Sequence, residues 1–313
     1  MNKILIIILT AVFAMCASPL ASGQVVTQMG KENLKVPRGI KSDKGQVELD
    51  PSVTIDTETP YFQLIDSAQV FINSHEWPQA ESLLRQAVAT DPTNPNNSLI
   101  LSNIATLQRY QGRLNDAAKN YSMALDLTPN ATTLLLNRAA LMVEMDSMDQ
   151  AQADFKRVCD LDITNTEARY SLGMMALEQN NDKTAEDYFN QIKRINPSSG
   201  LYCEGMAMLH KKQGHYLRAA ELLSQVIKAQ PTAQLLGNRA DCYLMLKQLN
   251  NAEEDIRNGL AINPDDPYLY ILKAKLNKMR FAYDDMNADL EQAIKMGVPR
   301  ELAKSLLNNS EKD

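Results

Sequence analysis

The sequence predicts an all-α protein built from repeated helix–turn–helix units, and three observations support this fold class. Glycine and proline are scarce, with 12 and 13 residues among 313, which argues against a fold made mainly of turns. Small residues, most of them alanine, recur about every 34 positions after residue 60. A proline follows most of these intervals and would end a helix there. Length alone suggests about two globular domains, but the period predicts one elongated array.

Residues 1–23 have the pattern of a signal peptide. Lys3 precedes an apolar run from Ile4 to Met15, and small residues follow as far as Gly23. The run is shorter than the ~20 apolar residues that span a bilayer, so it predicts export and cleavage near Gly23. In an alternative interpretation Cys16 carries a lipid anchor, but Met15 stands where such sites usually have a small residue.

Export predicts a periplasmic or extracellular location. The remaining cysteines, Cys159, Cys203 and Cys242, are odd in number and widely spaced, which does not make a disulfide framework. So few cysteines in an exported chain favour a bacterial envelope over a eukaryotic secretory route. No later segment approaches 18 uninterrupted apolar residues, so we expect no integral membrane segment in the mature chain.

Residues 24–60 differ from the rest of the chain, because prolines and glycines punctuate them and no helical apolar period appears. The stretch is interpreted as an extended linker that tethers the folded part. The alternative is an arm that lies in a groove of the same chain, since apolar and polar residues alternate between Val47 and Ile55.

Composition and motifs argue against catalysis and nucleic-acid binding. The formal charge is −6, without the basic stripe that binds phosphates. Common nucleotide-binding, hydrolase and zinc-protease motifs are missing from the sequence. The histidines His75, His210 and His215 are too few and too scattered to suggest a zinc site. We therefore expect a non-enzymatic protein with no catalytic residues, no cofactor and no metal.

Seven units can be aligned between residues 61 and 300. Each has a small residue at its eighth position and a bulky residue at its 24th position. The second helix of each unit starts near another recurring residue, which is small in all units but the last: Ala80, Ala117, Ala151, Ala185, Ala219, Ala252 and Met286. Small residues let two helices approach closely, and bulky residues fill the space between units.

This pattern resembles the tetratricopeptide repeat, a helix–turn–helix unit of 34 residues. The resemblance implies a right-handed α-solenoid of about seven such units with a C-terminal capping helix in residues 301–313. The units are 61–94, 98–131, 132–165, 166–199, 200–232, 233–266 and 267–300. At position 15, Gly112, Asp146, Asn180 and Gly214 suit the left-handed conformation that ends a helix.

The resemblance also implies a concave groove lined by the first helix of each unit, because members of the family bind peptides or helices there. Charge changes sign along this predicted groove, from glutamates in units 3 and 4 to lysines in units 5 and 7, which could orient a bound segment. The candidate partner-binding residues are Tyr110, Leu136, Val143, Glu144, Tyr170, Met174, Leu177, Glu178, Met208, Lys211, Lys212, Leu244, Tyr268 and Lys275.

The sequence thus favours a scaffold that binds a peptide or protein partner, of unknown identity, in the cell envelope. Methionines in the predicted groove adapt to varied partners, although the same apolar residues could instead be buried between neighbouring helices. One alternative is a structural protein that associates with copies of itself. Another is an accessory factor to an envelope carbohydrate or enzyme complex, in which tyrosines stack on sugar rings.

Overall fold

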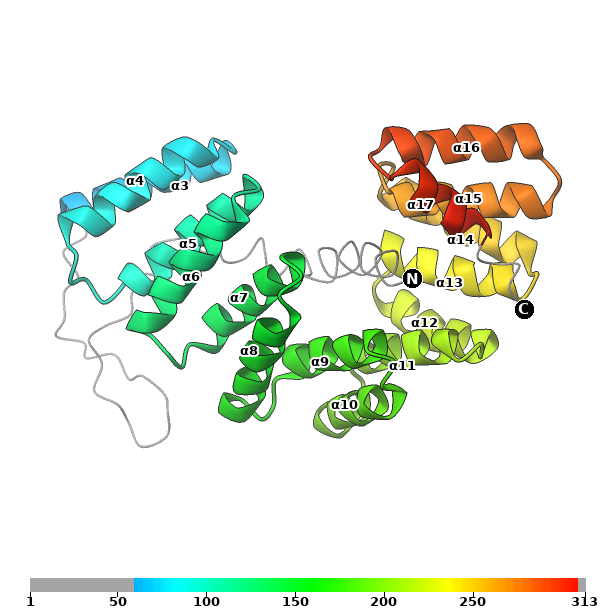
Figure 1. Cartoon of the computed structure of the whole chain (residues 1–313), viewed down its shortest axis with the longest axis horizontal. Helices are drawn as coiled ribbons and strands as arrows, with labels where there is room; N and C mark the ends of the chain where they lie inside the picture. The colour runs from blue at the N-terminus through cyan, green and yellow to red at the C-terminus, as the bar shows by residue number, and fades with distance from the viewer. Residues whose placement is uncertain (1–58, 309–313) are drawn as a thin grey trace. The chain divides into compact units, whose positions relative to one another are not determined.

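The computed structural model describes residues 59–308, which form fifteen α-helices, α3 to α17, and no strands (Figure 1). They fall into two compact units, residues 59–163 and 164–308, here called the N-terminal unit and the C-terminal unit. The predicted all-α fold class is confirmed. The predicted signal peptide lies outside the described residues, as do residues 24–58 of the predicted linker and the last five residues of the chain.

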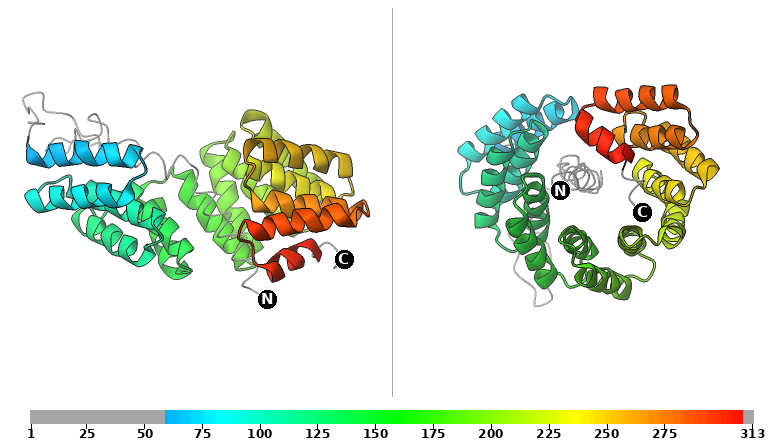
Figure 2. Two further views of the ribbon diagram at one scale, coloured as in Figure 1. Left: turned by 90° about the horizontal axis from the view of Figure 1, so that it is seen from above. Right: turned by 45° about the vertical axis from the view of Figure 1, so that its right-hand side comes forward.

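The N-terminal unit contains three helix pairs. These are α3 (Pro60–Asn73) with α4 (Trp77–Thr90), α5 (Asn97–Tyr110) with α6 (Leu114–Leu127), and α7 (Thr132–Glu144) with α8 (Met148–Leu161). The two helices of each pair lie side by side (Figure 2). Small residues at the crossing, such as Ala68 and Ala80, are fully buried, which is what a close approach of two helix axes requires.

The C-terminal unit contains four more pairs and one single helix. The pairs are α9 (Thr166–Glu178) with α10 (Asp182–Ile195), α11 (Gly200–Lys212) with α12 (Tyr216–Ala229), α13 (Ala233–Met245) with α14 (Leu249–Ile262), and α15 (Pro267–Met279) with α16 (Tyr283–Lys295). The single helix α17 (Arg300–Asn308) packs against both helices of the last pair. Within residues 59–308, none of the helices combines the length and the apolar character needed to cross a membrane.

The turn inside every pair has the same backbone. Residue 15 of each repeat has a positive φ of 58–77° in all seven, including Gly112, Asp146, Asn180 and Gly214 as predicted. The other three are His75, Lys247 and Phe281, residue types that sequence reasoning had no cause to place there. At each turn two backbone amides bond back to the end of the first helix, as in Phe281 to Lys278 and Ala282 to Asn277. These bonds satisfy carbonyls that the helix leaves open, and they outweigh the local cost of the left-handed residue.

The last helix, α17, covers the end of the array. Leu302, Leu306 and Leu307 are buried, while Lys304 is exposed, and Ala303 and Leu307 join a cluster with Ala274 and Leu290. The helix begins at Arg300, and the carbonyl of Pro299 accepts a bond from Ala303.

An ion pair joins the two helices of a repeat at positions 7 and 23 in repeats 3, 6 and 7. The pairs are Arg138–Asp154, Arg239–Asp255 and Lys273–Asp289. In repeats 3 and 6 the arginine is bidentate, with N···O distances of 2.6–2.8 Å. Each arginine also donates to a serine of the preceding repeat, Ser122 or Ser224. A single side chain thereby connects three helices from two repeats.

Candidate partner-binding surface

The first helices of the C-terminal unit form a continuous row. The side chain of Lys212 on α11 reaches α9, where it donates to the carbonyl of Leu177 at 2.7 Å. Asp241 on α13 is paired with Lys211 on α11 and with Lys275 on α15. Since the side chains of α9, α11, α13 and α15 meet in this way, functional groups from four successive repeats are brought onto one face.

A lysine–aspartate cluster lies at the centre of this row. Lys211 Nζ is 2.6 Å from Asp241 Oδ2, and Lys275 Nζ is 3.2 Å from Asp241 Oδ1. The three side chains are 23%, 12% and 11% exposed for Lys211, Asp241 and Lys275. Burial opposes the charge of Asp241, but the two ammonium groups outweigh it and hold the pKa of this carboxyl well below its usual value. Asp241 stands at a groove position of repeat 6, one repeat before Lys275, but its pairing with the two lysines was not predicted.

Lys212 is held by a second carboxylate. Its ammonium group is 2.7 Å from Asp182 Oδ1, at the start of α10. The hydrogen bond from Lys212 lowers the pKa of Asp182. Lys212 therefore belongs to an ion pair between repeats 4 and 5. The other two predicted lysines, Lys211 and Lys275, share the carboxylate of Asp241.

The predicted apolar groove residues of the C-terminal unit fall into two groups. Tyr170, Met174, Leu177 and Leu244 are buried. Leu244 belongs to the core cluster between repeats 6 and 7, with Ala240, Ile256 and Leu269. Its side chain fills the space between helix pairs, which is the alternative in which the apolar residues are buried between neighbouring helices. Met208 and Tyr268 are partly exposed, as is Glu178.

The predicted residues of the N-terminal unit are also mixed. Tyr110 is 45% exposed, and its ring lies 5.6 Å from that of Trp77. Leu136 is partly exposed and Val143 is buried. Glu144 accepts a hydrogen bond from Arg109 at 2.6 Å, so its charge is matched within the unit. Glu144 therefore contributes little net negative charge to the acidic part of the predicted groove.

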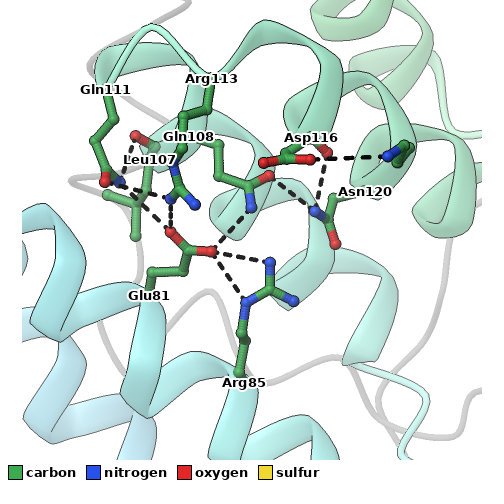
Figure 3. Close-up of polar contacts among 9 residues, drawn as sticks. Glu81, Arg85, Leu107, Gln108, Gln111, Arg113, Asp116 and Asn120 are labelled. Carbon is green, nitrogen blue, oxygen red and sulfur yellow. Dashed lines mark hydrogen bonds and ion pairs between the residues drawn. The ribbon is translucent and has the colours of Figure 1, made fainter.

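A polar network around Glu81 joins repeats 1 and 2 (Figure 3). Glu81 on α4 is buried, and its carboxylate accepts from Arg85 at 3.0 Å, from Gln108 at 2.9 Å and from Arg113. Gln108 in turn accepts from Asn120 at 2.8 Å. Burial favours the neutral acid, but the hydrogen bonds from Arg85, Gln108 and Arg113 outweigh it, so the pKa of Glu81 is lowered. The network is a structural link between repeats.

We expect the Glu81→Gln variant to lose about 1–3 kcal/mol of stability at pH 7, since a charged acceptor of several buried donors is replaced by an amide. The pKa of Glu81 in the folded protein lies below the ordinary value of a glutamate. The stabilisation is therefore complete above the pKa that Glu81 has in the unfolded chain, and it is lost as the pH falls through the lower pKa of the folded protein.

Thermal unfolding followed by the fluorescence of Trp77, the only tryptophan, measures this difference in repeat 1. The difference in unfolding temperature between wild type and Glu81→Gln should be smaller at pH 3 than at pH 7. Glu76→Gln, at an exposed position on the turn before α4, is the control and should change little at either pH. An equal difference in unfolding temperature at both pH values would contradict the prediction that the ionised carboxylate of Glu81 stabilises the fold.

The seven helix pairs with identical turns have the geometry of one known repeat. The sequence profile of the tetratricopeptide repeat family matches residues 65–132, 143–200 and 205–267, more than half of the chain. The chain belongs to the tetratricopeptide repeat family. Members of this family are generally non-enzymatic scaffolds for protein interactions.

Solved structures and curated relatives agree with this membership. A tetratricopeptide repeat protein from Parabacteroides merdae is 29% identical, with a TM-score of 0.68 over 80% of this chain and 98% of the other. The pilF protein of Pseudomonas aeruginosa has 18% identity and a TM-score of 0.53, covering 69% of this chain and 97% of its own. Anaphase-promoting complex subunit 3 of Schizosaccharomyces pombe is 21% identical over 63% of this tetratricopeptide repeat protein, which spans only 29% of that relative.

Proposed function

We propose that this tetratricopeptide repeat protein is an exported, non-enzymatic scaffold that binds a peptide or protein partner along its first helices in the cell envelope. Family membership supports the scaffold role. The signal-peptide pattern of residues 1–23 supports export to the periplasm or the extracellular space. The identity of the partner is left to experiment.

One observation carries the proposal for the binding surface. On the first-helix row of the C-terminal unit, the partly exposed apolar side chains of Met208 and Tyr268 lie on the same helices as Lys211 and Lys275. An apolar contact region beside a few charged groups is the usual composition of a protein-binding surface. Methionine adds adaptability because its side chain is flexible and polarisable.

The test is site-specific photo-crosslinking in cells that make the protein. A benzophenone amino acid replaces Met208 on α11 in one variant and Leu217 on α12 in a matched control. Leu217 is also apolar and belongs to the same repeat, but it is 58% exposed on the second helix. We expect an adduct with a partner protein from position 208 and not from position 217.

A charged substitution at the same position measures how much Met208 contributes to binding. Met208→Glu places a charge in an apolar contact, so binding of the crosslinked partner should weaken by about tenfold or more. Equal adducts from positions 208 and 217 would refute the surface assignment. An adduct with twice the mass of the chain would replace the partner by a second copy, and recovery of the chain in the cytoplasmic fraction would refute the envelope location.

A further inference from the structure

The lysine–aspartate cluster of Lys211, Asp241 and Lys275 has one positive charge more than it has negative charges. Two ammonium groups on α11 and α15 share the single carboxylate on α13. Charges with little exposure to water are costly unless a counter-charge is near. Two other ion pairs of the first helices are matched one to one, Arg109 with Glu144 and Lys212 with Asp182.

From this imbalance we infer that the cluster is the docking site for an aspartate or glutamate side chain of the bound peptide. The inference rests on the proposed function and names the chemistry of the partner. A carboxylate would bring the charge that balances the second lysine, and charge-assisted hydrogen bonds of this kind are among the strongest in proteins.

The geometry supplies donors for such a ligand. Each ammonium group has three N–H donors. Within residues 59–308, Lys275 gives one of them to Asp241, and Lys211 gives one to Asp241 and one to the hydroxyl of Tyr268. The hydroxyl of Tyr268 accepts the bond from Lys211, and burial raises its pKa, so the hydroxyl stays protonated and can donate its own proton. Two ammonium groups and one hydroxyl can thus converge on an incoming carboxylate.

Asp241 also explains why a carboxylate fits better than a phosphate. It holds the two lysines together against their mutual repulsion and leaves a net charge of +1. A carboxylate carries −1 and balances this charge. A phosphorylated residue carries about −1.5 to −2 and would bring excess negative charge next to Asp241 in a site of limited exposure. The cluster therefore selects singly charged acidic side chains.

The probe is a library of random 12-residue peptides displayed on phage, with each peptide joined to the coat protein at its C-terminus. The full-length mature protein is the immobilised target. We expect the selected peptides to be enriched in aspartate or glutamate relative to the starting library. A synthetic copy of the best peptide should bind at least about tenfold more weakly when its acidic residue is changed to the matching amide.

The variant Lys211→Gln/Asp241→Asn/Lys275→Gln removes all three charges and leaves no buried carboxylate unpaired. We expect it to keep its circular dichroism spectrum and to select peptides without acidic enrichment. Lys228→Gln/Lys295→Gln removes two exposed lysines from second helices and should select the same acidic peptides as the wild type.

The outcomes separate this inference from the proposed function. Selection of peptides with no acidic enrichment, or equal acidic enrichment by the triple variant, would overturn the docking site while leaving peptide binding in place. If no peptide is enriched by the wild type, both proposals are overturned. Single variants Lys211→Gln and Lys275→Gln, each leaving Asp241 one partner, test the same point if the triple variant fails to fold.

Discussion

Replacement of Phe189 by alanine will lower the free energy of unfolding by about 3–5 kcal/mol, the cost of removing a fully buried aromatic ring. Phe189 on α10 is completely buried. Its ring lies against Gly173 on α9 and Gly205 on α11, where a Cβ at Gly205 would be only 2.5 Å from ring carbons. One side chain thus fills the contact among three helices of repeats 4 and 5. Chemical denaturation followed by circular dichroism measures the loss.

A double-mutant cycle tests whether the ring of Phe189 is the reason that a side chain is not tolerated at Gly173. A Cβ on Gly173 would also collide with Phe189, so Gly173→Ala should cost about 1–3 kcal/mol in the wild type. In the Phe189→Ala background the same change has room, and its cost should largely vanish. Gly200→Ala is the control, because its Cβ would meet only Val226 at 3.4 Å. Additive losses from Gly173→Ala and Phe189→Ala would contradict the packing argument.

The repeat architecture could be predicted from the sequence because its signals are local and recur. Small residues at the helix crossing, bulky residues between pairs and prolines after second helices all appear at fixed spacing. The left-handed turn was predictable only where the residue type favours it, as at Gly112 and Asn180. At Phe281 and Lys247 the same conformation is imposed by the helix-end hydrogen bonds and the packing of the pair, which no local residue preference reveals.

The candidate surface was less predictable. The position of a residue within the repeat predicts which face of the helix it lies on, but not how deeply its side chain is buried. Leu244 and Met208 occupy corresponding faces of α13 and α11, yet Leu244 lies in a core cluster and Met208 is partly exposed. Asp241 was missed as a partner of Lys211 and Lys275. The spacing of one repeat between Asp241 and Lys275 was a usable signal, since equivalent positions of adjacent first helices lie side by side.

The largest electrostatic effect is expected at the ion pair of repeat 6. Arg239→Ala should cost about 3–5 kcal/mol, because it leaves the carboxylate of Asp255, 3% exposed, buried without its partner. It also removes the hydrogen bond to Ser224 in the preceding repeat. Denaturant unfolding of the full chain should show the loss as a lower midpoint.

A double variant with apolar groups in place of both charges separates two contributions to the loss of stability. One is the cost of leaving the carboxylate of Asp255 buried without a partner, and the other is the net stabilisation that the ion pair provides. Arg239→Met/Asp255→Leu should recover most of the stability, since well-packed apolar replacements of a buried pair are often close to neutral. The exposed pair Arg218–Glu221, at 58% and 51% exposure, is the matched control, and Arg218→Ala should cost less than about 1 kcal/mol. If the double variant is as unstable as Arg239→Ala, the pair itself and its bond to Ser224 stabilise the contact between repeats, because in that case removing the buried charge restores nothing.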